Sequence, residues 1–157
     1  LSGLWQTLID LAAWVEKGKA PLASSSYQVN VGQVNVGETA AERGGIQPVV
    51  HFFANGEKCA HVKAGETVTF TAQAEVPENA GTLTSVEYSF EGETDFPYKG
   101  EFQLTDGGKK GTAKTEHSFL TPGTYFAVVK VRSQRNGNKE DVFTQVRNID
   151  RVRIVVE

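Results

Sequence analysis

The side chains that could carry out chemistry in this sequence are widely separated. His51, His61 and His117 show no zinc-ligand spacing. Cys59 precedes His61 by two residues, but a free cysteine usually behaves as a small buried or half-buried apolar residue. The serines at 24–26 lack the flanking glycines of a G-x-S-x-G nucleophile elbow. We therefore expect that the chain is not an enzyme by itself and holds no catalytic set, metal or cofactor.

One acidic loop could in principle bind a hard cation, which prefers several oxygen ligands. Glu91, Glu93 and Asp95 alternate along this loop, and Glu101 follows it. The spaced Asp, Asn and Gly residues of a calcium loop are absent. We interpret the segment as a solvated acidic turn.

A group of aromatic residues is the candidate ligand-binding site. Phe96, Tyr98 and Phe102 lie on or beside a segment that joins two expected strands. Aromatic rings in such a place can stack on a sugar or on an apolar surface. The alternative is that they cover the edge of the fold, because large aromatic residues tend to be buried.

Composition narrows the possible partners. The 157 residues are 39% hydrophobic and 22% charged, as in ordinary globular domains. The net charge of −3 gives no reason to expect nucleic acid or an anionic membrane surface as a partner. No apolar run approaches the ~20 residues that span a bilayer. The single cysteine, Cys59, allows no internal disulfide.

Residues 1–17 are predicted to form a helix, because apolar residues recur at three- and four-residue spacing. Gly18 suits the position just past the helix, and Pro21 prevents its continuation. The helix is apolar almost all round, which is typical of buried helices. We expect it to pack on its own sandwich or, preferably, on a neighbouring molecule, with Trp5 or Trp14 buried there.

Residues 1–20 are therefore expected to belong to an upstream domain, and residues 21–47 to form a linker. The linker contains a short internal repeat, V-N-V-G at 29–32 and again at 34–37, which fits a strand pair or an extended tether. The stretch 38–45 is polar, and we expect it to be flexible. The sequence starts at Leu1 and has no methionine, so we expect a processed or excised piece of a longer protein.

From Pro48 the pattern changes to short segments of period-two alternation separated by turn signals such as Asp106-Gly107-Gly108 and Asn136-Gly137. About seven such segments with no helix between them predict an all-β, antiparallel β-sandwich over residues 48–157. The expected inward-facing residues are Val68, Phe70, Tyr88, Phe90, Tyr125, Ala127, Val129, Val152 and Ile154. The outward positions of the last strands are rich in arginine, including Arg132, Arg135, Arg147, Arg151 and Arg153, which a solvated face explains.

The segment His117-Ser118-Phe119-Leu120-Thr121-Pro122-Gly123-Thr124-Tyr125 resembles the central motif of PKD domains, which are immunoglobulin-like sandwiches. In that family a Pro-Gly turn leads into a strand that opens with tyrosine, whose hydroxyl can return to the backbone. Residues 64–70 and 85–92 resemble two earlier strands of the family. Tyr88 stands where the family usually has tryptophan.

The N-terminal segment carries a second resemblance. Residues 8–21, with Trp14-Val15-Glu16 and Gly18-Lys19-Ala20-Pro21, are similar to the last helix of α/β-hydrolases of the tannase and feruloyl esterase family. This resemblance implies a secreted or periplasmic parent enzyme whose catalytic serine, acid and histidine precede Leu1. The chain would then be an accessory module that packs on that catalytic domain. The alternative is a module that binds a polysaccharide or protein surface for the parent enzyme.

Overall fold

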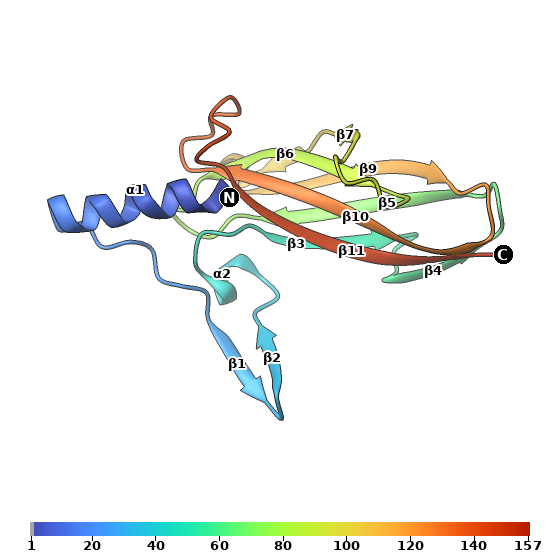
Figure 1. Ribbon diagram of the computed structural model, residues 1–157, viewed down its shortest axis with the longest axis horizontal. Coiled ribbons are helices and arrows are strands. Elements are labelled where there is room, and N and C mark those ends of the chain that lie inside the picture. The colour runs from blue at the N-terminus through green and yellow to red at the C-terminus, as the bar shows by residue number, and fades with distance from the viewer. Residues whose placement is uncertain (1) are drawn as a thin grey trace.

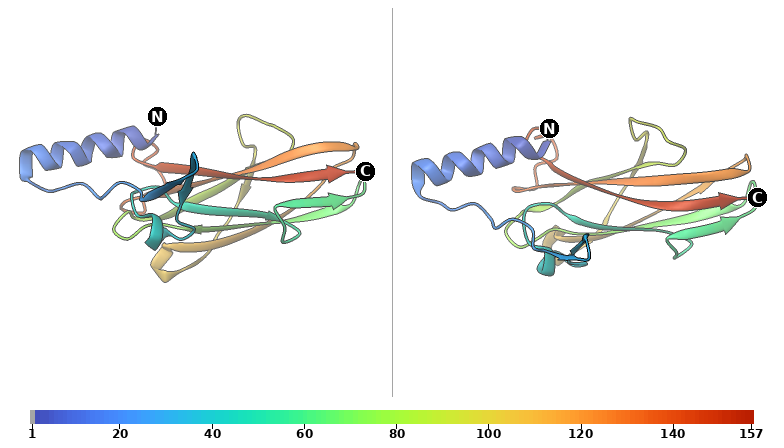
Figure 2. Two further views of the ribbon diagram at one scale, coloured as in Figure 1. Left: turned by 90° about the horizontal axis from the view of Figure 1, so that it is seen from below. Right: turned by 60° about the horizontal axis from the view of Figure 1, so that its bottom comes forward.

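Two β-sheets packed face to face form the body of the protein, as the alternation of residues 48–157 predicts (Figures 1 and 2). The computed structural model describes residues 2–157. Its helices and strands are α1 (Ser2–Lys17), β1 (Tyr27–Asn30), β2 (Gln33–Val36), α2 (Ala40–Arg43), β3 (Val49–Ala54), β4 (Cys59–Val62), β5 (Thr67–Glu75), β6 (Thr82–Ser89), β7 (Tyr98–Gly100), β8 (Gln103–Thr105), a 3-10 turn (Asp106–Gly108), β9 (Lys110–Ser118), β10 (Gly123–Gln134) and β11 (Val146–Val156).

The first sheet has the strand order β4-β11-β10-β6-β7 and the second has the order β3-β5-β9-β8. All pairs in both sheets are antiparallel except β11 with β4, which is parallel. The two longest strands, β10 and β11, pair from Gly123 opposite Val156 to Ser133 opposite Val146. These two strands therefore give the first sheet its long axis.

Period-two alternation places one side of each strand in the core between the sheets. Eight of the nine residues expected to face inward are buried, and Tyr125 is half-buried against the same core. Aromatic rings fill the centre: Phe70 lies 5.5 Å from Phe52 and 4.9 Å from Phe90 between ring centroids. The predicted fold class and strand phase are thus confirmed.

The tyrosine corner expected from the sequence is also present. Tyr125 donates its hydroxyl hydrogen to the backbone carbonyl of Thr121 at 2.8 Å. The Nε2 of His117 on β9 lies 3.1 Å from a carboxylate oxygen of Glu91 on the loop after β6. That loop lies against the same end of the sandwich.

The segment 21–47 contains regular structure. The repeat at 29–37 lies in the antiparallel hairpin β1–β2, which projects from the side of the sandwich (Figure 1). Helix α2 begins with a capping box, in which Thr39 and Glu42 satisfy each other's backbone N–H groups. Glu75 of β5 accepts a hydrogen bond from the Ala40 N–H at 3.2 Å. Helix α2 was not predicted, although its T-x-x-E capping signal at Thr39 is present in the sequence.

Helix α1 ends where the sequence predicts. Gly18 has a φ of 67°, a left-handed value that glycine adopts without strain. Its N–H donates to the Trp14 carbonyl at 3.0 Å. Among residues 2–157, no helix has both the length and the apolar character required to cross a bilayer.

Replacing Phe70 by alanine should lower the free energy of unfolding by about 3–5 kcal/mol, because the ring is completely buried among other rings. The matched control is Phe126→Ala, since the Phe126 ring lies half-exposed on the outer side of β10. We expect the control to cost less than about 1 kcal/mol. Urea denaturation of both variants measures the difference, and equal losses would contradict the strand phase.

Burial raises the pKa of Tyr88 to about 12. The unfolded chain loses this proton near pH 10, so the folded state is favoured most below pH 10. Stability should then fall by up to about 3 kcal/mol as the pH rises from 10 through 12. In Tyr88→Phe this fall should be smaller, whereas Tyr27→Phe, at an exposed ring, should behave as the wild type. Denaturation between pH 8 and 12 tests this, and an unchanged slope in Tyr88→Phe would contradict it.

Candidate functional site

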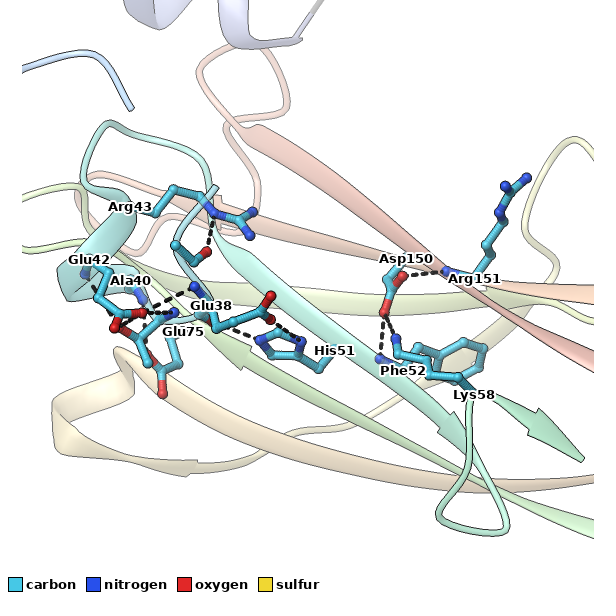
Figure 3. A network of polar contacts seen from close by, with 12 residues as sticks. Glu38, Ala40, Glu42, Arg43, His51, Phe52, Lys58, Glu75, Asp150 and Arg151 are labelled. Atoms are coloured by element: carbon cyan, nitrogen blue, oxygen red, sulfur yellow. Dashed lines mark hydrogen bonds and ion pairs between the residues drawn. The ribbon is translucent and has the colours of Figure 1, made fainter. Parts of the chain in front are cut away.

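The structure does not bring the three histidines together. His51 on β3 bonds to the backbone carbonyl of Glu38 at 2.7 Å (Figure 3). His61 lies on β4 near Cys59, with 3.8 Å between Nε2 and the sulfur. His117 lies on β9 and stacks on Phe90 at 4.4 Å between centroids. Within residues 2–157 no three His, Cys, Asp or Glu side chains gather in a way that could hold a metal ion.

The acidic loop after β6 is held by its own hydrogen bonds. One carboxylate oxygen of Glu93 accepts from the Ser89 hydroxyl and from the N–H groups of Phe90 and Glu91, all within 3.0 Å. Burial alone would raise the pKa of Glu93, but these hydrogen bonds outweigh it and lower the pKa. The carboxylate of Glu91 contacts the imidazole of His117 at 3.1 Å. The arrangement therefore stabilises the turn.

The three aromatic residues of the candidate binding site lie in different surroundings. Phe96 stacks under the Lys130 ammonium, which is 4.1 Å from the ring centroid. Tyr98 is partly exposed and packs on Phe90 at 4.9 Å between centroids. Phe102 packs against the core beside Gly111. Phe96 therefore lies toward the outer face of the sheet, whereas Tyr98 and Phe102 pack inward.

Helix α1 contacts the sandwich through its polar side. Gln6 and Asp10, one turn apart, are 5% and 9% exposed. Arg135, just beyond the end of β10, donates to both carboxylate oxygens of Asp10, and Gln6 donates to the same carboxylate at 3.0 Å. This ion pair fixes the N-terminal half of the helix on one end of the sandwich, and the C-terminal half extends beyond it (Figure 1).

Most of the apolar surface of α1 is left uncovered by the sandwich. Seven of its large apolar side chains are between 46% and 77% exposed: Leu4, Trp5, Leu8, Ile9, Leu11, Trp14 and Val15. We call these seven residues the α1 apolar face. Docking on its own sandwich buries neither tryptophan, because Trp5 and Trp14 are both half-exposed, so that part of the expectation is wrong. The preferred part, packing on a neighbouring molecule, stays a prediction. A helix normally turns its apolar side inward.

The Asp10–Arg135 pair was not predicted from the sequence. Arg135 was expected among the arginines of the outer strand face, but the residue lies after β10 and turns toward α1. A signal was present in the sequence, because a carboxylate halfway along an apolar helix requires a partner when it is buried.

A groove lies between α1, the chain that returns from it and the sandwich. Its volume is about 770 Å³, and Leu4, Leu11, Trp14, Leu22 and Ile46 contribute its apolar lining. Thr7, Asp10 and Arg147 contribute polar groups to the same groove. The underside of the helix is thus also accessible along part of its length.

The chain matches a known family. The model of the family described as PKD domain matches residues 54–146, which is more than half of the chain. No curated protein matches the chain.

The solved structures to which the chain shows some similarity include two Bacillus proteins. The sporulation control protein Spo0M from Bacillus subtilis is 12% identical with a TM-score of 0.39, over 71% of this chain and 49% of that one. BcpA*(D312A), the major pilin subunit of Bacillus cereus, is 11% identical with a TM-score of 0.36, over 85% of this chain and 48% of that one. The chain spans about half the length of each of these proteins.

Replacing Asp10 by alanine should release α1 without unfolding the sandwich, because the ion pair is the main polar contact between them. We expect hydrogen exchange in residues 3–17 to become at least tenfold faster, while exchange in β10 and β11 is unchanged. Glu16→Ala is the control, since this exposed carboxylate lies on the same helix and forms no ion pair within residues 2–157. Unchanged exchange in Asp10→Ala would show that other contacts hold the helix.

Proposed function

Because the chain belongs to the PKD-domain family, we propose that it is a non-catalytic accessory module of a larger secreted or periplasmic α/β-hydrolase and packs on the catalytic domain of that enzyme. PKD domains are generally extracellular accessory or adhesion modules. Residues 8–21 resemble the last helix of hydrolases of the tannase and feruloyl esterase family, which supports this choice of parent.

The observation that carries the proposal is the orientation of α1. Its Asp10 side is bound to the sandwich, and the α1 apolar face is left exposed. Full burial of a large apolar side chain is favourable by about 1.5–3 kcal/mol, so seven such side chains make a strong docking surface. A catalytic domain that packs on this face would also be linked to the sandwich through the ion pair.

The alternative function is a binding module that targets the parent enzyme through Phe96, Tyr98 and Phe102. The rings lie in different surroundings and include one packed against the core, so this site has less support than α1. The two functions differ in the surface that they require, and they can be tested separately.

The coding sequence immediately upstream of Leu1 is the first test of the parent enzyme. We expect a G-x-S-x-G elbow and a histidine shortly before the helix. An upstream region without a hydrolase motif would contradict the choice of parent, but it would leave a docking role for α1 open.

The second test measures docking directly. Trp5 and Trp14 are the two tryptophans of the chain, so its tryptophan fluorescence reports on α1 once the emission of the added domain has been subtracted. When the upstream domain is added in trans to residues 1–157, we expect a blue shift of the emission. Leu8→Ser should weaken this binding at least tenfold, because the side chain lies in the middle of the α1 apolar face. The control is Val31→Ser at the exposed tip of the β1–β2 hairpin.

Deleting residues 1–20 should leave the sandwich folded, with little change in its melting temperature, and should remove any self-association of the isolated chain. Sedimentation velocity and thermal denaturation check the two outcomes. A sandwich that unfolds without residues 1–20 would show that α1 is part of its core, which would contradict the proposal.

A further inference from the structure

The outer face of the five-stranded sheet is strongly basic. Its outward positions follow from the strand register: Arg147, Ile149, Arg151, Arg153 and Val155 on β11, Thr124, Phe126, Val128, Lys130 and Arg132 on β10, Ser85, Glu87 and Ser89 on β6, Lys99 on β7, and Cys59 and His61 on β4. These positions hold six basic residues and one acidic residue. The whole chain has 16 basic and 19 acidic residues, so ten basic and eighteen acidic residues lie outside this face. An acidic protein thus carries one face with a net charge of +5.

The single acidic residue of this face is already occupied. Glu87 binds Lys130 at 2.8 Å and Arg132 at 2.9 Å. The ring of Phe96 lies against Lys130 and covers this side of the face. These groups form a closed, half-buried cluster that leaves no acidic side chain for the arginines of β11.

Three arginines of β11 are exposed and form no ion pair within residues 2–157: Arg147, Arg151 and Arg153. We call them the β11 arginine row. The positions 147 to 153 span about 20 Å along the strand. In Figure 3 the side chain of Arg151 extends away from the sandwich. Arg147 also lies directly opposite Arg132 across the two strands, and like charges in this position destabilise a sheet. An external anion would relieve that repulsion.

Apolar groups lie between these charges. Phe126 is opposite Arg153 and Ile149 is opposite Lys130, and both are more than half exposed. The Arg151 guanidinium lies 5.7 Å from the centroid of the Phe126 ring. The row therefore alternates cationic groups, which can bind carboxylate or sulfate with two parallel hydrogen bonds, with apolar surface.

We propose that the β11 arginine row binds a linear polysaccharide that carries regularly spaced anionic groups. An acidic sugar offers an apolar ring face together with an anionic group at its rim, which matches the alternation along the strand. A single extended chain contacts only the row. A DNA duplex would also approach the acidic remainder of the protein, and the sequence pI of about 5.7 is far below that of typical nucleic-acid-binding domains. This proposal is independent of the parent enzyme.

The test uses residues 1–157 and affinity electrophoresis in gels that contain one polymer each: a polyuronate for carboxylate, dextran sulfate for sulfate, unmodified dextran as the neutral polymer, or duplex DNA. We expect retardation by one or both anionic polysaccharides and none by dextran. The retardation should weaken at least tenfold between 50 and 200 mM salt, because counterions are released on binding. Comparison of the first two gels identifies the anion.

The variant Arg147→Gln/Arg151→Gln/Arg153→Gln should lose at least tenfold in affinity for the anionic polysaccharide. The matched control is Lys17→Gln/Lys19→Gln/Lys114→Gln, which removes the same charge at exposed positions on α1, just after α1 and on β9 of the other sheet, and should keep its affinity within twofold. Thermal denaturation confirms that both variants fold, and the three single substitutions replace the triple variant if it does not. The proposal is overturned if the wild type is not retarded, if dextran or DNA binds equally well, or if both triple variants lose the same affinity.

Discussion

The antiparallel pairing of β10 with β11 is the interaction on which the rest of this structure depends. These strands run side by side along the length of the first sheet. Their alternation therefore fixes which side chains of the neighbouring strands face the core and which face solvent. One side supplies Ala127, Val129, Val152 and Ile154 to the core, and the other side must then face solvent. A shift of one residue in this register would expose the core side chains and bury arginines, which is why the pairing is strongly specified.

The same pairing explains how much could be read from the sequence. Alternation identified the strands of the sandwich and the core residues because burial on one face is a local, repeated signal. The tyrosine corner was predicted in another way, because the Pro122-Gly123 turn and Tyr125 belong to a short motif that resembles the one in PKD domains. Short edge strands such as β4 and β7 were missed, since a strand of three or four residues carries too few alternations to stand out.

The orientation of α1 could not be predicted in this way. Its apolar spacing predicts a buried face, and the simplest expectation is that this face meets the protein. One carboxylate reverses the orientation: Asp10 is bound by Arg135, a residue 125 positions later, and desolvated groups of opposite charge must stay paired. Such a contact depends on where the ends of two distant elements meet. The same is true of the candidate aromatic residues, whose neighbours Lys130, Phe90 and the core come from other strands.

The surface of the protein is consequently divided by chemistry as well as by geometry. The α1 apolar face lies at one end of the sandwich, and the β11 arginine row begins beside it, because Arg147 lines the groove under α1. An apolar face gains most of its binding free energy from excluded water, whereas exposed charges act over about 10 Å at ordinary salt and are weakened by more salt. Added salt should therefore weaken the binding of a polymer along β11 much more than the binding of a domain on α1. Because Arg147 lies next to α1, a domain bound to the α1 apolar face would border one end of the β11 arginine row.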